Sequence, residues 1–179
     1  MTNRQQWTLI AGVVTTAVFG IALAVKLRPQ LELLEVGSSA PTFHAVRLPG
    51  GTPVTIDDYR GKVVLLNIWA TWCPPCKVEM PSMERLHKKL AGLQDFRLVA
   101  VSVDEDDSTV VDKFVKDMGL TFEILHDRSG AIRQIYQTTG VPESFVIDRD
   151  GVIVKKVIGA ADWEAPENEQ LIRRLLGGR

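Results

Sequence analysis

The sequence contains two cysteines, Cys73 and Cys76, and they stand in a Cys-Pro-Pro-Cys motif. An apolar run of strand length, residues 63–69, precedes the motif, as expected for a parallel strand that is buried on both faces. Apolar residues at helical spacing follow the motif, namely Met83, Leu86, Leu90 and Leu93. A C-x-x-C motif that opens a helix directly after such a strand indicates a thiol–disulfide redox centre.

Two other interpretations of the cysteine pair are weaker. A tetrahedral zinc site needs about four ligands, and the sequence offers neither a second C-x-x-C nor an H-x-x-x-H pair. His44, His87 and His126 are scattered singly, so we expect each to be a surface or loop residue and expect no metal site. A purely structural disulfide is also disfavoured, because a bridge that closes so small a loop removes little entropy from the unfolded chain.

The position of the two cysteines predicts different roles for them. Cys73 falls at the start of the helix, where the helix dipole and free backbone donors stabilise a thiolate, and Cys76 falls one turn inside. We expect an exposed Cys73 to attack a substrate disulfide and Cys76 to resolve the mixed disulfide. If Cys73 is the N-cap, Pro75 occupies the second helical position and offers no N–H, which leaves mainly the Cys76 amide as a donor. Fewer donors mean a less stabilised thiolate, which predicts a reductase rather than a strong oxidant.

Glu79 is the candidate proton carrier. At about 100° per residue, it falls on the helix face that carries Cys76 and the core residues Met83, Leu86 and Leu90. We expect its carboxyl group to be partly desolvated, with a pKa raised toward the range that is useful for proton transfer.

Three separated segments resemble the thioredoxin superfamily, and in particular its membrane-tethered ResA/TlpA/CcmG-like branch. They are the W-C-P-P-C-K segment, Pro81 five residues after Cys76, and Tyr136-Gln137-Thr138-Thr139-Gly140-Val141-Pro142 before a strand. The resemblance covers about residues 37–179. It implies a thioredoxin-like three-layer α/β sandwich with a central mixed sheet, an extra N-terminal hairpin and a helix–strand insertion.

The resemblance also implies a substrate-contacting surface. Pro142 resembles the superfamily's cis-proline, and a cis bond there would place the Val141 backbone beside Cys73, ready to pair with an extended substrate as an added strand. Glu143 stands where thioredoxin commonly has threonine, so we expect a more acidic substrate surface. The substrate-contacting residues that we expect are Trp72, Pro74, Pro75, Val141, Pro142 and Glu143.

The resemblance also implies which residue carries the proton. Thioredoxin uses a buried aspartate on the central strand, and the aligned position here is Asn67, which cannot titrate. ResA-like proteins carry an active-site glutamate at the position that matches Glu79. The resemblance implies no cofactor beyond the redox-active Cys73–Cys76 disulfide.

The rest of the chain predicts strands that alternate with helices, followed by an antiparallel hairpin and a last helix. Ser108 is the expected N-cap of one helix, which Gly119 closes, and the Asp150-Gly151 pair indicates a hairpin turn. The expected strands cover residues 42–48, 52–56, 63–69, 97–103, 122–125, 144–148 and 152–158. The expected helices cover residues 74–91, 108–118, 129–136 and 166–176.

The N-terminus carries an uncharged apolar stretch from Trp7 to Val25, close to the ~20 residues that span a bilayer. We expect residues 1–28 to form an uncleaved signal anchor in the cytoplasmic membrane, residues 29–36 a linker, and residues 37–179 the redox domain on the periplasmic, oxidising side. The segment Ala22-Leu23-Ala24 resembles a signal-peptidase site, so a soluble periplasmic protein is the alternative.

These expectations combine into an extracytoplasmic thiol–disulfide oxidoreductase. The resemblance implies that it reduces disulfides of exported proteins such as apocytochrome c, with electrons from a membrane thiol reductant. The net charge of −1, with acids and bases interspersed, indicates no nucleic-acid partner.

Two alternative functions share features with this one. A peroxiredoxin-like peroxidase would carry P-x-x-x-[ST]-x-x-C, but Leu66 and Ala70 stand at the proline and threonine positions. A membrane-tethered copper chaperone would have three residues between its cysteines and a distal histidine, whereas two residues separate the cysteines here.

Overall fold

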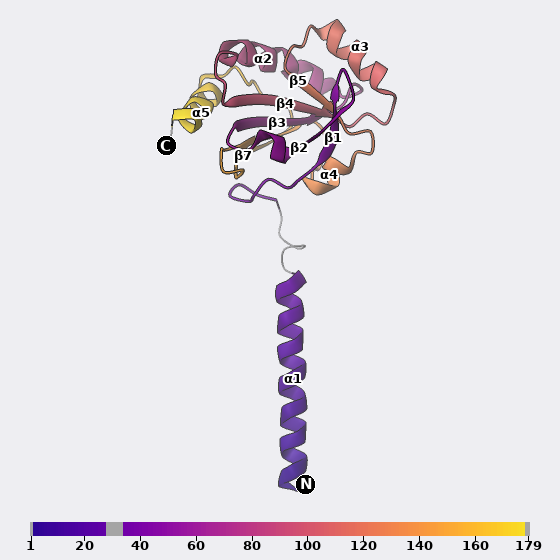
Figure 1. Ribbon diagram of the computed structural model, residues 1–179, viewed down its shortest axis with the longest axis vertical. Coiled ribbons are helices and arrows are strands. Elements are labelled where there is room, and N and C mark those ends of the chain that lie inside the picture. The colour runs from indigo at the N-terminus through magenta and orange to yellow at the C-terminus, as the bar shows by residue number, and fades with distance from the viewer. Residues whose placement is uncertain (1, 28–33, 178–179) are drawn as a thin grey trace. The chain divides into compact units, whose positions relative to one another are not determined.

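The computed structural model describes residues 2–27 and 34–177 (Figure 1). They belong to two units, an N-terminal helix, α1 (Asn3–Leu27), and a folded unit that begins at Leu34. Most of the expected linker, residues 29–33, lies outside the described residues. Its last part belongs to the folded unit, because Leu34 is only 7% exposed, three residues before the expected start at Gly37.

Helix α1 has the length and composition needed to cross a membrane. Its segment Asn3–Val25 reaches a mean hydropathy of 2.2. All of its described side chains are exposed, including Trp7 and Phe19. A helix that is apolar all round has no face for water, which is typical of a segment with an apolar environment.

The described part of the folded unit is built on a seven-stranded mixed sheet, in the order β2-β1-β5-β4-β3-β6-β7. The strands are β1 (His44–Leu48), β2 (Thr52–Thr55), β3 (Val63–Trp69), β4 (Phe96–Ser102), β5 (Glu123–His126), β6 (Glu143–Ile147) and β7 (Ile153–Ile158). The central β3 pairs in parallel with β4 and antiparallel with β6, and every one of its residues is buried. The expected α/β fold with a mixed sheet is therefore confirmed.

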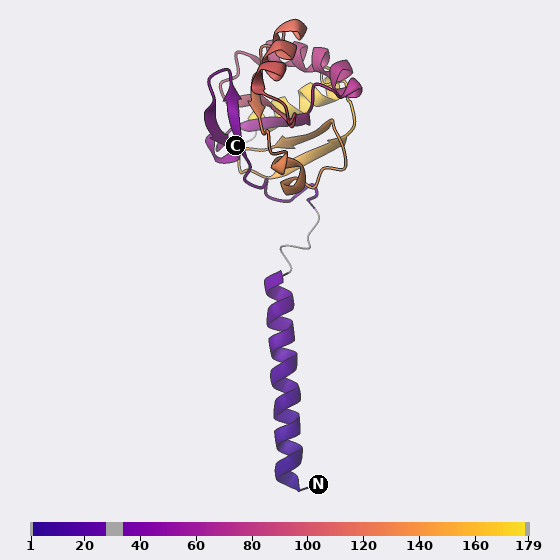
Figure 2. The same cartoon turned by 90° about the vertical axis from the view of Figure 1, so that its right-hand side faces the viewer.

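Helices cover both faces of this sheet (Figures 1 and 2). Helices α2 (Pro74–Leu90), α3 (Ser108–Met118) and α5 (Pro166–Gly177) lie on one face, and the short α4 (Ala131–Ile135) lies on the other. Trp69 of β3 contacts Phe114 of α3, with ring centroids 5.1 Å apart. On the α4 face, Tyr136 packs edge-on against Phe43 and Phe145. A short 3-10 helix, Ile56–Tyr59, leads from β2 toward β3.

The ends of the elements differ from the expected ones by no more than two residues. The expected N-cap of α3 was wrong by one residue, because the carboxylate of Asp107 accepts the N–H of Thr109 at 3.0 Å. Helix α4 begins two residues late, because the N–H and hydroxyl of Ser129 both bond to Asp127 in a turn. Gly119 closes α3 in the left-handed conformation, as expected.

His126 is not the surface residue that we expected. It lies on β5, it is 4% exposed, and its Nε2 is 2.8 Å from the carbonyl oxygen of Asp104. His44 is exposed on β1, and His87 is half-buried on α2. A lone histidine within a short strand gave no periodic signal of burial, and the contact with Asp104 explains why the ring lies inside.

Candidate active site

The dithiol motif lies at the junction that the sequence predicted. Cys73 is the N-cap of α2 and forms a disulfide bond with Cys76, with Cα atoms 5.3 Å apart. The Cys73 Sγ accepts a hydrogen bond of 3.1 Å from the N–H of Cys76. Pro74 and Pro75 fill the first two helical positions, where they offer no N–H. The predicted single-donor environment around Cys73 is therefore present.

Both sulfur-bearing residues are buried in this disulfide state. Cys73 is 2% exposed and Cys76 is 0% exposed, so the expectation of an exposed Cys73 was wrong for the oxidised protein. The reason is the approach of a distant segment, since the Cys73 Sγ lies 3.4 Å from the carbonyl oxygen of Val141. Trp72, which directly precedes Cys73, is 59% exposed.

The segment before β6 supplies the second part of the site. The peptide bond between Val141 and Pro142 is cis, as predicted. Its position opposite Cys73 brings together residues 68 apart in the sequence. The backbone of Val141 thus lies where an extended chain that presents a disulfide to Cys73 could pair with it.

Glu79 is a buried carboxyl group on the same helix as the disulfide. It is 2% exposed, and its oxygens accept hydrogen bonds from Asn67 Nδ2 (2.8 Å), the Ala161 N–H (3.1 Å) and Trp163 Nε1 (3.4 Å). Burial raises the pKa of Glu79 to about 7, although these three hydrogen bonds act in the opposite direction. The expected desolvated carboxyl group, with a pKa suited to proton transfer, is present.

The loop after β7 reaches this carboxyl group from the other side. The Trp163 N–H donates to Ser82 Oγ at 3.0 Å, which fixes the loop on α2. Glu79, Ser82 and Ala161 line a pocket of about 310 Å³ that opens to the surface. The sequence did not reveal Ala161 or Trp163, which are 82 and 84 residues from Glu79 and stand in no motif.

Glu143 does not make the substrate surface acidic. Its side chain is fully buried, with Oε1 3.3 Å from Lys156 Nζ and with Oε2 accepting the Thr139 N–H at 3.1 Å. The expectation was wrong because an ion pair with a strand neighbour, Lys156 of β7, holds the carboxylate inside. The partner lies on a different strand, so the residue type of Glu143 alone could not reveal it.

A buried aspartate holds the turn that leads into Cys73. The carboxylate of Asp104 accepts the N–H of Thr71 at 3.0 Å and its hydroxyl at 2.6 Å. It also accepts the hydroxyl of Ser102 at 2.6 Å. Asp104 is 0% exposed, so its bonds with Thr71 are shielded from water. No pattern in the sequence pointed to this residue, which follows β4 rather than the motif.

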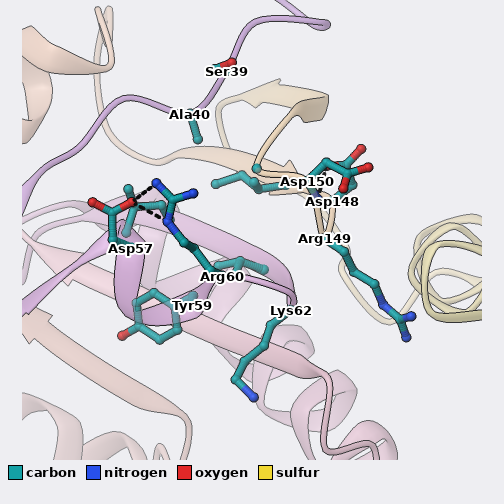
Figure 3. Close-up of a pocket in the computed structure, with 13 residues that line it drawn as sticks. Ser39, Ala40, Asp57, Tyr59, Arg60, Lys62, Asp148, Arg149 and Asp150 are labelled. Atoms are coloured by element: carbon teal, nitrogen blue, oxygen red, sulfur yellow. Dashed lines mark hydrogen bonds and ion pairs between the residues drawn. The ribbon is translucent and has the colours of Figure 1, made fainter.

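A larger charged pocket lies at the start of β3, whereas Cys73 follows the end of β3 (Figure 3). Arg60 turns toward Asp57, with an N–O distance of 2.7 Å. The side chains of Lys62 and Arg149 point away from Asp57. These cations therefore do not converge on one anion. Within residues 2–27 and 34–177, no group of three or more His, Cys, Asp or Glu residues could hold a metal ion.

Comparisons with known proteins agree with this geometry. The Redoxin family matches residues 35–172. Thiol-disulfide oxidoreductase ResA of Bacillus cereus (strain ATCC 10987 / NRS 248) is 34% identical over 165 residues, 92% of this chain and 94% of its own. ResA of Geobacillus thermodenitrificans (strain NG80-2) is 36% identical and covers 83% of each chain. A crystal structure from Chlorobium tepidum, assigned as thiol:disulfide interchange protein DsbE, superposes with a TM-score of 0.72 and 31% identity, over 80% of this chain and 99% of its own.

Proposed function

The chain belongs to the redoxin family and is a ResA-like thiol–disulfide oxidoreductase of the thioredoxin superfamily, and from this premise we propose that it reduces disulfides of exported proteins, such as apocytochrome c, outside the cytoplasm. One observation carries the proposal most directly. The Cys73 sulfur lies 3.4 Å from the Val141 carbonyl oxygen. The attacking atom therefore lies next to a backbone edge with which an extended polypeptide can pair.

The reaction begins with the reduced dithiol. The Cys73 thiolate attacks one sulfur of the substrate disulfide, and the other substrate sulfur leaves as a thiolate that takes up a proton. The start of α2 stabilises the attacking thiolate through the helix dipole and the Cys76 N–H. Trp72, Pro74, Pro75, Val141 and Pro142 surround this step as the substrate-contacting residues.

Glu79 serves the second step. The Cys76 thiol must lose its proton before it can attack the mixed disulfide, and Cys76 is fully buried. Cys76 and Glu79 are three residues apart on α2, which places them on one helix face. Glu79 takes the proton, Cys76 attacks Cys73, and the second substrate thiolate leaves. The substrate gains two electrons, and the enzyme becomes the Cys73–Cys76 disulfide.

The direction of the reaction follows from Pro75. A proline at the second helical position withholds one N–H from the thiolate, so the reduced form is less stabilised and the couple is more reducing. The enzyme then needs two electrons for each turnover, which a thiol reductant in the membrane supplies. Helix α1 anchors the chain beside that donor, and the redox domain lies on the oxidising side.

A trapping experiment tests the substrate class. The full-length Cys76→Ser variant is expressed in its native membrane, where Cys73 forms mixed disulfides that no resolving thiol can release. Mass spectrometry of the adducts should find exported proteins that carry cysteine pairs, apocytochrome c among them. The Cys73→Ser, Cys76→Ser double variant is the matched control. Adducts only with cytoplasmic proteins would contradict the proposed location and substrate class.

A further inference from the structure

The chain enters the folded unit at a residue that is held on both sides. The N–H of Leu34 donates to Gln137 Oε1 at 3.0 Å, and its carbonyl oxygen accepts from Lys156 Nζ at 3.2 Å. The side chain is buried as well, at 7% exposure. Both polar backbone groups of the first described residue after α1 are thus fixed by side chains more than 100 residues away.

Both of these side chains are also connected with the segment that faces Cys73, since Gln137 is its first residue and Lys156 contacts Glu143 at its end. We call residues 137–143 the cis-proline loop, since they carry Val141 and Pro142. Gln137 opens this loop with a φ of 50°, a left-handed conformation that is uncommon outside glycine. A non-glycine residue stays in this conformation when its surroundings determine it, and the bond to Leu34 is one such determinant.

Lys156 reaches the other end of the same loop. Its ammonium group lies 3.3 Å from the Glu143 carboxylate, whose second oxygen accepts the Thr139 N–H at 3.1 Å. The Lys156 side chain is 15% exposed and that of Glu143 is fully buried, so this ion pair is shielded from water and depends on its geometry. One ammonium group thus contacts the chain at Leu34 and the residue that follows Pro142.

We propose that Lys156 and Gln137 are positioning residues that hold the cis-proline loop in order by fixing both of its ends to the chain at Leu34. The proposal rests on the proposed function, because the ordered loop is the edge on which an extended protein substrate pairs. A loosened loop must be ordered again when the substrate binds, and that cost reduces affinity. The attack of Cys73 on a small disulfide needs no such pairing.

The test compares two substrates on the full-length protein in detergent micelles. One is a peptide with an internal disulfide in an extended sequence, turned over with dithiothreitol as reductant. The other is a small chromogenic aromatic disulfide that reacts with the reduced enzyme. For Lys156→Met, we expect KM for the peptide to rise about 10-fold, with kcat and the rate with the small disulfide within about twofold of wild type. Lys156→Arg keeps the charge and should restore KM.

Two further variants keep the test decisive if Lys156→Met leaves Glu143 as a buried unpaired charge and unfolds the protein. Gln137→Gly favours the same backbone conformation without the amide, and Glu143→Gln combined with Lys156→Met removes both charges together. Each should raise KM for the peptide. Lys113→Met, which removes an exposed lysine of α3, is the matched control and should leave KM unchanged.

The outcomes separate the proposal from the proposed function. An unchanged KM for the peptide in the folded variants would overturn the positioning role, and so would an equal loss of rate with both substrates. A wild-type protein that turns over the small disulfide but not the peptide would contradict the proposed function instead. Gln137 and Lys156 share Leu34, so a double variant should raise KM by less than the product of the single effects.

Discussion

The amide of Asn67 on the central strand β3 donates a hydrogen bond of 2.8 Å to the Glu79 carboxyl group on helix α2. The same Nδ2 donates to Ser144 Oγ on the neighbouring β6, also at 2.8 Å. Three elements of the fold, β3, α2 and β6, thus meet at one buried cluster around Glu79. Because neither asparagine nor serine titrates at physiological pH, Glu79 is the ionisable member of this cluster.

Replacement of Glu79 by glutamine should slow disulfide exchange by about 10²-fold or more, the lower range of general acid–base contributions. Glutamine keeps the size of the side chain but cannot accept the proton of Cys76. The pH profile of the rate should also lose an inflection near pH 7, where the carboxyl group titrates. Stopped-flow measurements across pH on the two proteins give both quantities. Equal rates and equal profiles would remove Glu79 from the mechanism.

Glu79 should also make the oxidised protein less stable at alkaline pH. Its pKa is raised from 4.5 to about 7 in the folded state, so folding favours the protonated form. The contribution of Glu79 to stability is full below pH 4.5 and is lost as pH rises through about 7, a loss on the order of 3 kcal/mol. Urea unfolding at several pH values should show that the free energy of unfolding of Glu79→Gln rises relative to that of wild type as the pH increases over this range. A pH-independent difference would contradict the shifted pKa.

Brief alkylation of the reduced protein should label Cys73 first. The start of α2 and the Cys76 N–H favour a thiolate at Cys73, whereas Cys76 lies one turn inside the helix, away from the free backbone donors of its first turn. Mass mapping after substoichiometric labelling identifies the modified residue. The Cys73→Ser variant serves as the control, since its remaining thiol should react slowly. Faster labelling of Cys76 would reverse the two roles.

Replacement of Pro75 by alanine should make the couple more oxidising. Alanine restores an N–H at the second helical position. One more donor to the thiolate should raise the reduction potential of the couple by about 30 mV, equivalent to about 1.4 kcal/mol. Equilibration with glutathione should place wild type nearer to thioredoxin, at about −270 mV, than to DsbA, at about −120 mV. Pro166→Ala changes the first residue of α5 and should leave the potential unchanged. A strongly oxidising wild type would contradict the argument from Pro75.

Removal of the Asp104 carboxylate should destabilise the protein and loosen the turn before Cys73. Asp104→Ala leaves the donors of Thr71 and Ser102 without their buried acceptor, at a cost of about 2 kcal/mol or more. Asp107→Ala, which removes the exposed cap of α3, should destabilise the protein less than Asp104→Ala does. Chemical unfolding measures both. A smaller effect at Asp104 than at Asp107 would show that the buried contacts carry little stability.

The parts of the fold that the sequence predicted most closely are those with a dense local signal. The bounds of β3 agree with the apolar run at residues 63–69, because every side chain of that strand is buried. The start of α2 at Pro74 and the burial of Glu79 follow from the proline pair and from helical periodicity. The cis bond before Pro142 followed from the resemblance of its segment to a known family.

The remaining parts depend on contacts between distant residues. The burial of Cys73 comes from Val141, and that of Glu143 comes from Lys156 on a neighbouring strand. Apart from Asn67, the hydrogen-bond donors to Glu79 come from a loop more than 80 residues away in the sequence. Residue type and spacing report on local conformation, whereas each of these environments is set by the pairing of strands and the path of loops.

The order of strands also places a long-range pairing at the start of the folded unit. The hairpin β1–β2 comes first in the folded unit, but β1 pairs with β5 rather than with the central strand. Arg47 of β1 meets its partner Glu123 only after 76 further residues have emerged. Since β5 joins the sheet through β4, the hairpin can take its place only after both of these strands have formed, and the closure of so long a loop raises the contact order of the fold. Until then the edge of β1 stays open to pairing with another chain.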